Sequence, residues 1–199
     1  ESENTFMALT ESYMLPLKTN APRFSLLNVI NGKVEKLEAY KGKKGTLIVF
    51  ICNHCPFVLH LLDSLVETSK IFSKKEINTI AISSNNIITH PRDGIEGMKK
   101  MALNKKFTFP YFFDETQEIA RVYRAACTPD FYLFNSKLEL SYRGRYDASR
   151  PGNGILITGD DLLIACDLML KNKAIKTIQY PSIGCNIKWL EGNSPDELF

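Results

Sequence analysis

Cysteine, net charge and long apolar runs are all scarce in this sequence of 199 residues. Its five cysteines are an odd number and too few for the disulfide scaffold of a small secreted protein. The 25 basic and 22 acidic residues leave a net charge of +3, which is too small to indicate a nucleic acid or a membrane surface as partner. No segment approaches the roughly 20 apolar residues that a membrane helix needs. We therefore expect neither nucleic acid nor membrane among the partners.

The N-terminus lacks the pattern of a signal peptide. Residues Glu1–Phe6 are polar and acidic, without the basic start and apolar run of such a segment. Met7 is one candidate for the natural start, with the six residues before it as additions. We therefore expect a cytoplasmic protein, and in that compartment paired cysteines are more often catalytic or metal-binding than structural.

The chain has the length and composition of one globular domain, with 44% hydrophobic and 24% charged residues. Apolar and aromatic runs predict buried strands at 46–51, 77–82 and 109–113, and a hairpin at 131–134 and 138–143. Helical spacing predicts helices at about 56–75, 94–104, 115–124 (capped by Asp114) and 160–171. This alternation predicts an α/β layer fold with parallel strand pairs. The tail from Lys173 shows little periodicity, and we expect an ordered coil there.

The motif Cys52-Asn-His-Cys-Pro56 lies between the first buried strand and the helix that follows. The first N–H groups of a helix are unpaired, and the helix dipole is positive at that end. A thiolate there is stabilised, and its pKa falls from about 8.5 to as low as about 3.5–7.5. A second thiol close by can then resolve a mixed disulfide. The motif therefore predicts redox chemistry.

Pro56 indicates which cysteine attacks. Proline is tolerated at the first position of a helix and costs about 3 kcal/mol inside one. Pro56 therefore marks the first turn and puts Cys55 at the N-cap, with Cys52 upstream in the loop. We expect Cys55 to be the nucleophile and Cys52 its partner. His54 either adds positive charge or fills the loop.

A metal site and plain packing are the alternatives for this motif. Zinc usually needs four ligands, often as two closely spaced pairs, and the sequence holds no second pair. Zinc or copper bound by Cys52 and Cys55 would therefore need a further ligand from elsewhere, and the candidates are His54, His60 and Cys127.

Several segments resemble a known family. The resemblance is to the peroxiredoxin-like branch of the thioredoxin superfamily. It lies in residues 21–26 and 31–33, the strand at 46–51 and the run Thr128-Pro-Asp-Phe-Tyr-Leu-Phe134. That branch includes alkyl hydroperoxide reductases and thiol–disulfide oxidoreductases, and the match runs from about Ala21 to Tyr146. The sequence is most similar to a bacterial peroxiredoxin-like group that shares Cys-Asn-His-Cys-Pro, Ala-Cys-Thr-Pro-Asp-Phe and a tail like Pro181–Trp189.

The resemblance implies a thioredoxin-like α/β fold of the peroxiredoxin and glutathione-peroxidase type, with a mixed central sheet flanked by helices and an irregular C-terminal extension. It implies a lead-in at 1–20, a thioredoxin-like domain at 21–172 and an extension at 173–199 packed on that domain. It also implies that Pro129 is cis and lies beside the active-site cysteines. The backbone of Thr128 would pair with an incoming substrate strand, and His54 would lie in the substrate site.

Two departures from the peroxiredoxin pattern bear on the activity. Cys52 stands where peroxiredoxins have a threonine, and no arginine occupies the start of the strand near Thr128, where their peroxide-binding arginine lies. The resemblance therefore favours a cytoplasmic antioxidant thiol–disulfide oxidoreductase over an efficient thiol-dependent peroxidase. Its partners would be a protein or small-molecule disulfide, with peroxide as the poorer substrate, and a thioredoxin- or glutathione-type reductant. No metal or organic cofactor is expected.

The remaining candidates each have a functional and a structural interpretation. Cys127 and Cys185 are accessory redox thiols or small packing residues, whereas Cys166 lies on the apolar face of a helix and is expected in the core. Asp93 is expected to be a helix N-cap. Four polar residues form either a network beside the site or, the interpretation we favour, a solvated surface: Arg143, Arg145, Asp147 and Arg150.

Overall fold

The computed structural model describes residues 9–175 and 178–195, so the question of a start at Met7 lies outside the described residues. The helices are α1 (Pro56–Lys74), α2 (Ile95–Asn104), α3 (Glu118–Val122) and α4 (Asp160–Leu170), with short 3-10 turns η1 (Leu37–Ala39) and η2 (Pro91–Asp93). The strands are β1 (Leu9–Glu11), β2 (Ser25–Asn28), β3 (Lys33–Lys36), β4 (Gly45–Phe50), β5 (Ile77–Ser83), β6 (Tyr111–Phe113), β7 (Cys127–Thr128), β8 (Asp130–Asn135), β9 (Leu140–Gly144) and β10 (Ile183–Asn186).

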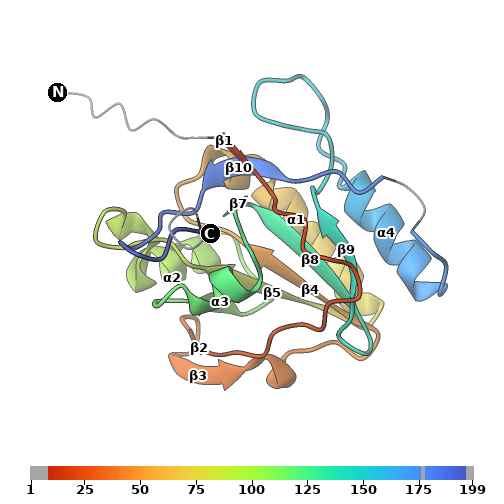
Figure 1. Cartoon of the computed structure of the whole chain (residues 1–199), viewed down its shortest axis with the longest axis horizontal. Helices are drawn as coiled ribbons and strands as arrows, with labels where there is room; N and C mark the ends of the chain where they lie inside the picture. Colours follow the sequence, from red (N-terminus) through yellow and green to blue (C-terminus); the bar gives the residue numbers. More distant parts are fainter. Residues whose placement is uncertain (1–8, 176–177, 196–199) are drawn as a thin grey trace.

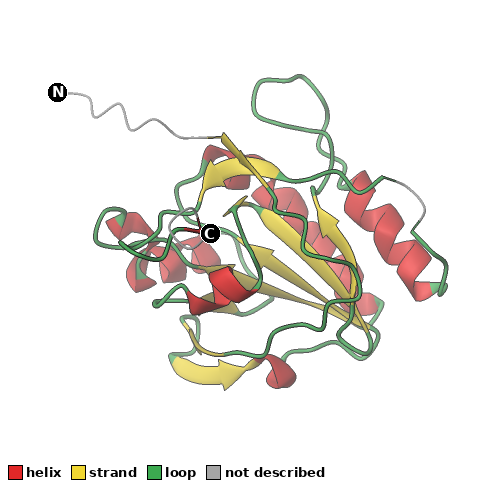
Figure 2. Ribbon diagram, in the orientation of Figure 1, coloured by secondary structure: helices red, strands yellow, loops and turns green. Residues whose placement is uncertain are grey.

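A seven-stranded mixed sheet forms the centre of the molecule, in the order β3-β2-β6-β5-β4-β8-β9 (Figures 1 and 2). Strand β4 pairs parallel with β5 and antiparallel with β8, and β8 forms the predicted hairpin with β9. All six residues of β4 are buried because the strand is central and covered on both faces. The predicted α/β fold, with a mixed central sheet flanked by helices, is confirmed.

Alternate residues of β4 enter two different hydrophobic cores, as the two-residue period of a strand requires. Leu47 and Val49 pack with the apolar faces of α1, α2 and α4, and this core contains Cys52, Cys55, Cys166 and Cys185. Ile48 and Phe50 pack on the opposite face with α3 and the turn η1. The redox motif therefore begins where β4 ends, at the edge of the core beneath α1.

The C-terminal tail contains a strand that its sequence pattern does not predict. Strand β10 lies between β1 and β7 in a small antiparallel sheet at one end of the molecule (Figure 1). The expectation of coil is wrong for these four residues. Gly184 makes the pairing close, because a Cβ atom there would lie 1.9 Å from the carbonyl oxygen of Thr128. The tail is thereby attached to the segment that precedes Pro129.

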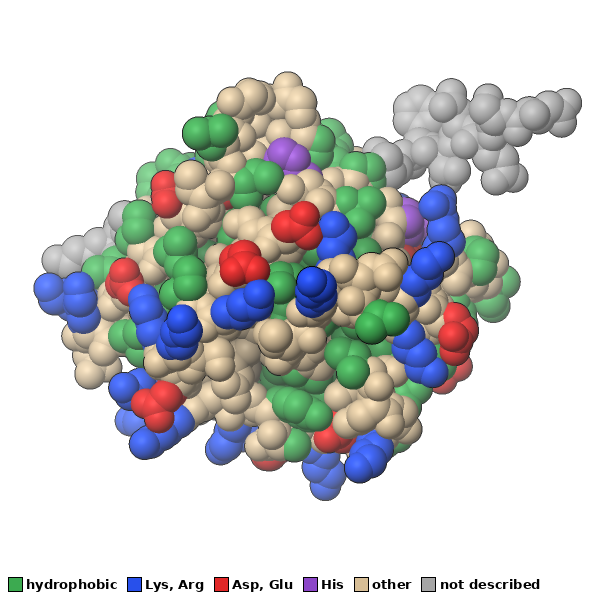
Figure 3. Space-filling view, turned by 180° about the vertical axis from the view of Figure 1, so that it is seen from behind, with side chains coloured by type: hydrophobic (Ala, Val, Ile, Leu, Met, Phe, Trp, Pro, Cys, Tyr) green, Lys and Arg blue, Asp and Glu red, His purple; other side chains and the backbone are tan. Residues whose placement is uncertain are grey.

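Two further features concern helix boundaries and the surface. The helix predicted from Glu115 begins at Glu118, yet Asp114 still accepts hydrogen bonds from the N–H groups of Ile119 and Ala120, at 3.2 and 2.8 Å. In Figure 3, Lys and Arg side chains are interspersed with acidic and apolar ones. None of the helices in the described part of the chain combines the length and apolar content that a bilayer crossing requires.

Candidate active site

Cys55 occupies the N-cap of α1, and Pro56 is the first helical residue. The sequence prediction of this position is confirmed. The backbone of Cys55 is extended, with φ −71° and ψ 123°, so its side chain lies at the positive end of a 19-residue helix. Cys52 lies one residue beyond Ile51, and the side chains of both cysteines are buried. Strand β4 and helix α1 thus bring the two thiols of the motif to one end of the central sheet.

The sulfur of Cys55 has two close neighbours on other segments. Its Sγ atom lies 2.7 Å from the Sγ of Cys185 and 3.4 Å from the carbonyl oxygen of Thr128. Hydrogen bonds from the thiols of Cys185 and Cys52 lower the pKa of Cys55 well below its ordinary value, although burial opposes this. The Thr128 hydroxyl and the backbone N–H of Cys185 add smaller contributions in the same direction. Among the cysteines of the site, Cys55 is the one whose surroundings lower the thiol pKa.

Cys52 has the opposite character. Its Sγ atom lies 3.5 Å from the hydroxyl of Thr128. Donation of a hydrogen bond to Cys55, burial and the negative charge of Asp93 all raise the pKa of Cys52 well above its ordinary value. The two cysteines of the motif are therefore unequal, because their surroundings lower the pKa of Cys55 and raise that of Cys52.

The three remaining cysteines lie in different surroundings. Cys127 is buried, and its sulfur lies 3.8 Å from the carbonyl oxygens of Pro129 and Ser182, while burial raises the pKa of its thiol. Cys185 contacts Cys55 directly. Cys166 lies in the core on α4, as predicted, and burial raises its pKa to about 11. Of the two accessory candidates, Cys185 is the one whose sulfur contacts that of Cys55.

Asp93 is the residue of the site that sequence reasoning misassigned. It is not the N-cap of α2, which is Gly94 with no side-chain cap. Its buried carboxylate instead accepts hydrogen bonds from the backbone N–H of Asn53 and from the side chain of Asn85, each at 2.8 Å. Burial would raise the pKa of Asp93, but these bonds and His54 outweigh it and lower the pKa.

His54 lies on the same carboxylate. Its Nδ1 atom is 2.7 Å from Oδ2 of Asp93, although no well-aligned N–H···O bond joins them among the described residues. The ring also stacks on His90, with centroids 5.1 Å apart. His54 therefore helps to fix the loop of the motif. Burial, together with the charge of His54, lowers the pKa of His90.

One group of potential metal ligands is present in the described ranges. Ligand atoms of Cys52, His54 and Asp93 all lie within 4.8 Å of one another. Thiolate, imidazole and carboxylate are donors that zinc accepts, and three protein ligands with one open position are typical of a catalytic zinc site. This set shares Cys52 and His54 with the predicted one but replaces Cys55 and Cys127 by Asp93. His60 is elsewhere, with Nε2 at 2.8 Å from the hydroxyl of Ser149.

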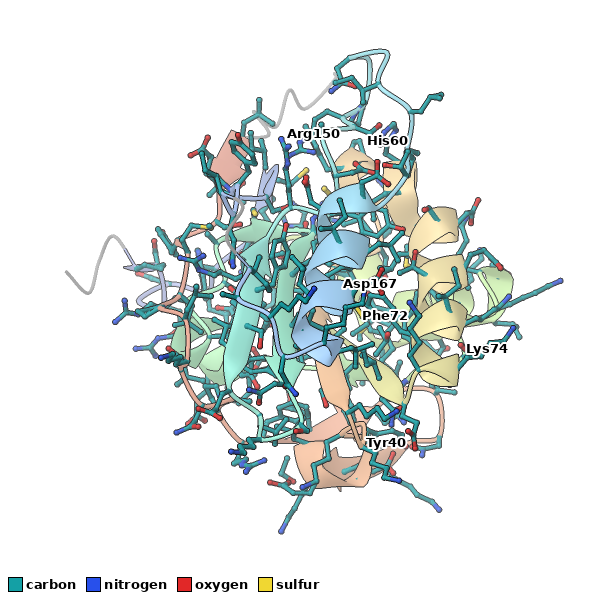
Figure 4. The ribbon with its side chains drawn as sticks, turned by 90° about the vertical axis from the view of Figure 1, so that its right-hand side faces the viewer. Tyr40, His60, Phe72, Lys74, Arg150 and Asp167 are labelled. Atoms are coloured by element: carbon teal, nitrogen blue, oxygen red, sulfur yellow. The ribbon has the colours of Figure 1, made fainter. Side chains whose placement is uncertain are left out.

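The expected solvated surface around Arg143–Arg150 is wrong, because these side chains are buried or partly buried and each makes its own hydrogen bonds or ion pair. Arg145 pairs with Asp161 at 2.6 Å, and Arg143 donates to the carbonyl of Leu15 at 2.8 Å. The carboxylate of Asp147 is buried and accepts bonds from the N–H groups of Thr158 and Gly159. Arg150 donates to the carbonyls of Asp147 and Ser149, and it lies near His60 at one end of the molecule (Figure 4). The bonds of Asp147 and Arg150 hold the loop that connects β9 to α4.

The segment beside the thiols contains the predicted cis peptide bond, between Thr128 and Pro129. Thr128 pairs with Cys185 of β10 on one side, and its pairing with an incoming substrate strand stays a prediction. The next residue, Asp130, is fully buried and accepts a 2.7 Å hydrogen bond from the hydroxyl of Ser12. Burial raises the pKa of Asp130 to about 7.

A family model described as AhpC/TSA family matches residues 17–143, a range that holds the motif, the cis-proline and most of the central sheet. The chain belongs to the AhpC/TSA family. Membership of this family supports a thiol redox function in general terms. No curated protein matches the sequence.

Two solved structures resemble this AhpC/TSA protein over almost its whole length. An uncharacterized conserved protein from Geobacillus kaustophilus is 48% identical, with a TM-score of 0.90, and the match covers 93% of this chain and 98% of that one. A hypothetical protein from Sinorhizobium meliloti 1021 is 38% identical, with a TM-score of 0.89 and coverage of 92% and 100%.

A third structure shows the fold. The thioredoxin domain of a thiol-disulfide oxidoreductase from Bacteroides vulgatus is 18% identical, with a TM-score of 0.60 and coverage of 78% of this chain and 99% of that one. At this identity the similarity shows the thioredoxin fold alone. This fold and the match to the AhpC/TSA family model together confirm the predicted thioredoxin-like, peroxiredoxin-like architecture.

Proposed function

We propose that this protein is a thiol–disulfide oxidoreductase in which the Cys55 thiolate is the nucleophile and Cys52 is its partner. The observation that supports this most directly is the unequal state of the two thiols. Cys55 lies at a helix N-terminus and accepts hydrogen bonds that lower its pKa, whereas the pKa of Cys52 is raised. A low-pKa attacking thiol beside a protonated second thiol is the arrangement that disulfide exchange needs.

The reaction balances as two exchanges. The thiolate of Cys55 attacks one sulfur of a substrate disulfide, and the other sulfur leaves as a thiolate. Cys52 then loses its proton and attacks the Cys55 sulfur of this mixed disulfide, which releases the second substrate thiol. The substrate disulfide is reduced by two electrons, and Cys52 and Cys55 are oxidised to a disulfide. A thioredoxin- or glutathione-type dithiol or thiol would restore the reduced pair, and a reducing compartment such as the cytoplasm would supply it.

Disulfide exchange is favoured over peroxide reduction because no arginine of the described residues donates a hydrogen bond to Cys55. The groups that contact its sulfur are thiols, the Thr128 side chain and backbone, and the backbone N–H of Cys185. A peroxidase needs donors that stabilise the departing oxygen.

The test is a turnover assay with a small disulfide, coupled to a thioredoxin or glutathione reducing system. We expect turnover in the wild-type protein and in Cys166→Ser, and none in Cys55→Ser. Equal loss in Cys55→Ser and Cys166→Ser would contradict the assignment. Hydrogen peroxide replaces the disulfide in a parallel series, and faster consumption of peroxide than of disulfide would favour the peroxidase alternative.

A metal-binding module is the second candidate, and the cluster of Cys52, His54 and Asp93 favours it. Cys52 would bind as a thiolate, so metal binding would remove the partner thiol from redox chemistry. Metal analysis of freshly purified protein tests this. One equivalent of zinc or copper that is lost in Asp93→Ala but kept in Cys127→Ser would support the module, whereas metal-free protein with five titratable thiols would contradict it.

A further inference from the structure

Strand β10 places Cys185, a thiol outside the motif, beside Cys55, the proposed nucleophile. The Sγ atoms of Cys185 and Cys55 lie 2.7 Å apart, although the residues are 130 positions apart in the sequence. Disulfide formation needs two Cβ atoms that face each other at short range, about 3.5–4.5 Å. No large movement of either strand β10 or helix α1 is needed to bring these two sulfurs together.

The position of Cys185 is fixed on both sides of its strand. In β10, Cys185 lies opposite Thr128 on one side and Leu9 on the other. Ser182 reinforces this attachment, because its hydroxyl donates to the carbonyl of Pro129 and its N–H donates to the hydroxyl of Ser12. The N–H of Ser12 returns a bond to the carbonyl of Ser182 at 3.0 Å. The small sheet therefore holds Cys185 at a defined place over Cys55.

Gly184 allows this approach. A Cβ atom at this position would lie 1.9 Å from the carbonyl oxygen and 2.7 Å from the carbonyl carbon of Thr128, which are backbone atoms that cannot rotate away. Any larger residue would push β10 off β7 and move Cys185 away from Cys55. Gly184, the residue before Cys185, therefore permits the close contact between β10 and Thr128.

We propose that Cys185 is a second resolving thiol, which attacks the Cys55 sulfur of the mixed disulfide in competition with Cys52 and ties strand β10 to helix α1. This rests on the proposed function, since it requires Cys55 to attack a disulfide first. In the step, the Cys185 proton is lost, a Cys55–Cys185 bond forms, the bond between Cys55 and the substrate breaks, and the substrate leaves as a thiolate that takes up a proton. Two protein thiols lose two electrons and become a disulfide, and the substrate disulfide gains those two electrons.

The charges around Cys55 and Cys185 determine when Cys185 can react. In the reduced protein, the hydrogen bond to Cys55, burial and the charge of Cys55 raise the pKa of Cys185. A mixed disulfide at Cys55 carries no charge and removes two of these three causes. The positive charge of Lys188, which lowers the pKa of Cys185, remains. Cys185 is therefore activated after Cys55 has reacted and not before.

Cys127 does not compete for this role. Its sulfur faces the carbonyl oxygens of Pro129 and Ser182 at 3.8 Å, which are acceptors and not partners for a disulfide. Burial and the charge of Asp130 hold its thiol in the protonated form.

The test uses Cys52→Ser, in which the competing thiol is absent. The reduced variant receives one equivalent of 2-hydroxyethyl disulfide, is quenched by acid and alkylation, and is digested for mass spectrometry. We expect the Cys55–Cys185 disulfide with release of both mercaptoethanol halves. The matched variant Cys52→Ser/Cys166→Ser should give the same product, and Cys52→Ser/Cys185→Ser should stop at a stable Cys55–hydroxyethyl adduct.

A persistent Cys55–hydroxyethyl adduct in Cys52→Ser itself would overturn the proposal while leaving Cys55 as the nucleophile. No adduct and no disulfide at Cys55 in any variant would overturn the proposed function instead. Gly184→Ala in the Cys52→Ser background, checked for native circular dichroism, provides a second test, because it retains the Cys185 thiol in the chain but moves it away from Cys55. We expect it to form the adduct and then to convert that adduct to the Cys55–Cys185 disulfide at least tenfold more slowly than Cys52→Ser does. An unchanged rate of disulfide formation there would contradict the role of β10.

Discussion

The buried carboxylate of Asp93 accepts a 2.8 Å hydrogen bond from the backbone N–H of Asn53, forty residues away in the sequence. The bond joins the turn η2 to the loop of the redox motif. The same carboxylate also contacts Asn85 and His54, so the Asp93 side chain holds the loop between the two cysteines in place. The motif therefore depends on a residue that lies outside it.

Asp93→Ala should destabilise the protein strongly. It leaves the N–H of Asn53 and the side chain of Asn85 buried without an acceptor, and each unsatisfied buried group costs about 1–3 kcal/mol. We expect the free energy of unfolding to fall by about 2–5 kcal/mol in urea titrations. Asp63→Ala is the control, because its carboxylate is exposed and forms a surface ion pair with Lys105, and it should cost less than about 1 kcal/mol. Similar losses in both variants would contradict the role of Asp93.

Cys185→Ala should raise the pKa of Cys55. The thiol of Cys185 is the strongest of the donors that lower the pKa, and alanine removes it. The ultraviolet absorbance of the thiolate, followed against pH in reduced protein, measures the shift. Cys166→Ala should leave the Cys55 step of the titration unchanged, since the Cys166 side chain lies in the core on α4. A Cys55 titration identical in the wild-type protein and Cys185→Ala would show that the sulfur contact has no electrostatic effect.

Asp130 should make the protein less stable as the pH rises. Burial raises its pKa to about 7 in the folded state, whereas the unfolded chain has the ordinary value of about 3.9. Between these values the folded state keeps a proton that the unfolded state has released, so the free energy of unfolding falls as the pH rises from about 4 to 7. Asp130→Asn cannot titrate and should lose this part of the slope.

Urea titrations at several pH values between about 4 and 8 would measure that slope. The exposed Asp63→Asn serves as the comparison and should retain the wild-type dependence. Parallel curves for the wild-type protein and Asp130→Asn would contradict the raised pKa.

The sequence alone predicts the parts of the molecule that follow from local pattern. The apolar runs predict β4 and β5, and Pro56 predicts the start of α1 and so the N-cap position of Cys55. These succeed because a buried strand and a proline each restrict the chain by themselves. The cis bond at Pro129 follows from the resemblance and not from a local pattern.

The parts that escape prediction depend on contacts between distant segments. Strand β10 is four residues long in an aperiodic tail, and only its pairing with β1 and β7 makes it a strand. Asp93 has the sequence context of a helix cap, and only the fold shows that its carboxylate is buried against Asn53. Cys185 is an accessory candidate from the sequence, but its contact with Cys55 depends on the close approach of Gly184 to Thr128, which only the fold shows.

The central claim is that Cys55 is a thiolate before substrate arrives. Its most direct test is the ultraviolet absorbance of the reduced wild-type protein against pH, with the Cys55→Ser titration subtracted. We expect one thiolate equivalent already present at neutral pH, with a midpoint well below the ordinary value of about 8.5. A difference titration with its midpoint at about 8.5 or above would contradict the account.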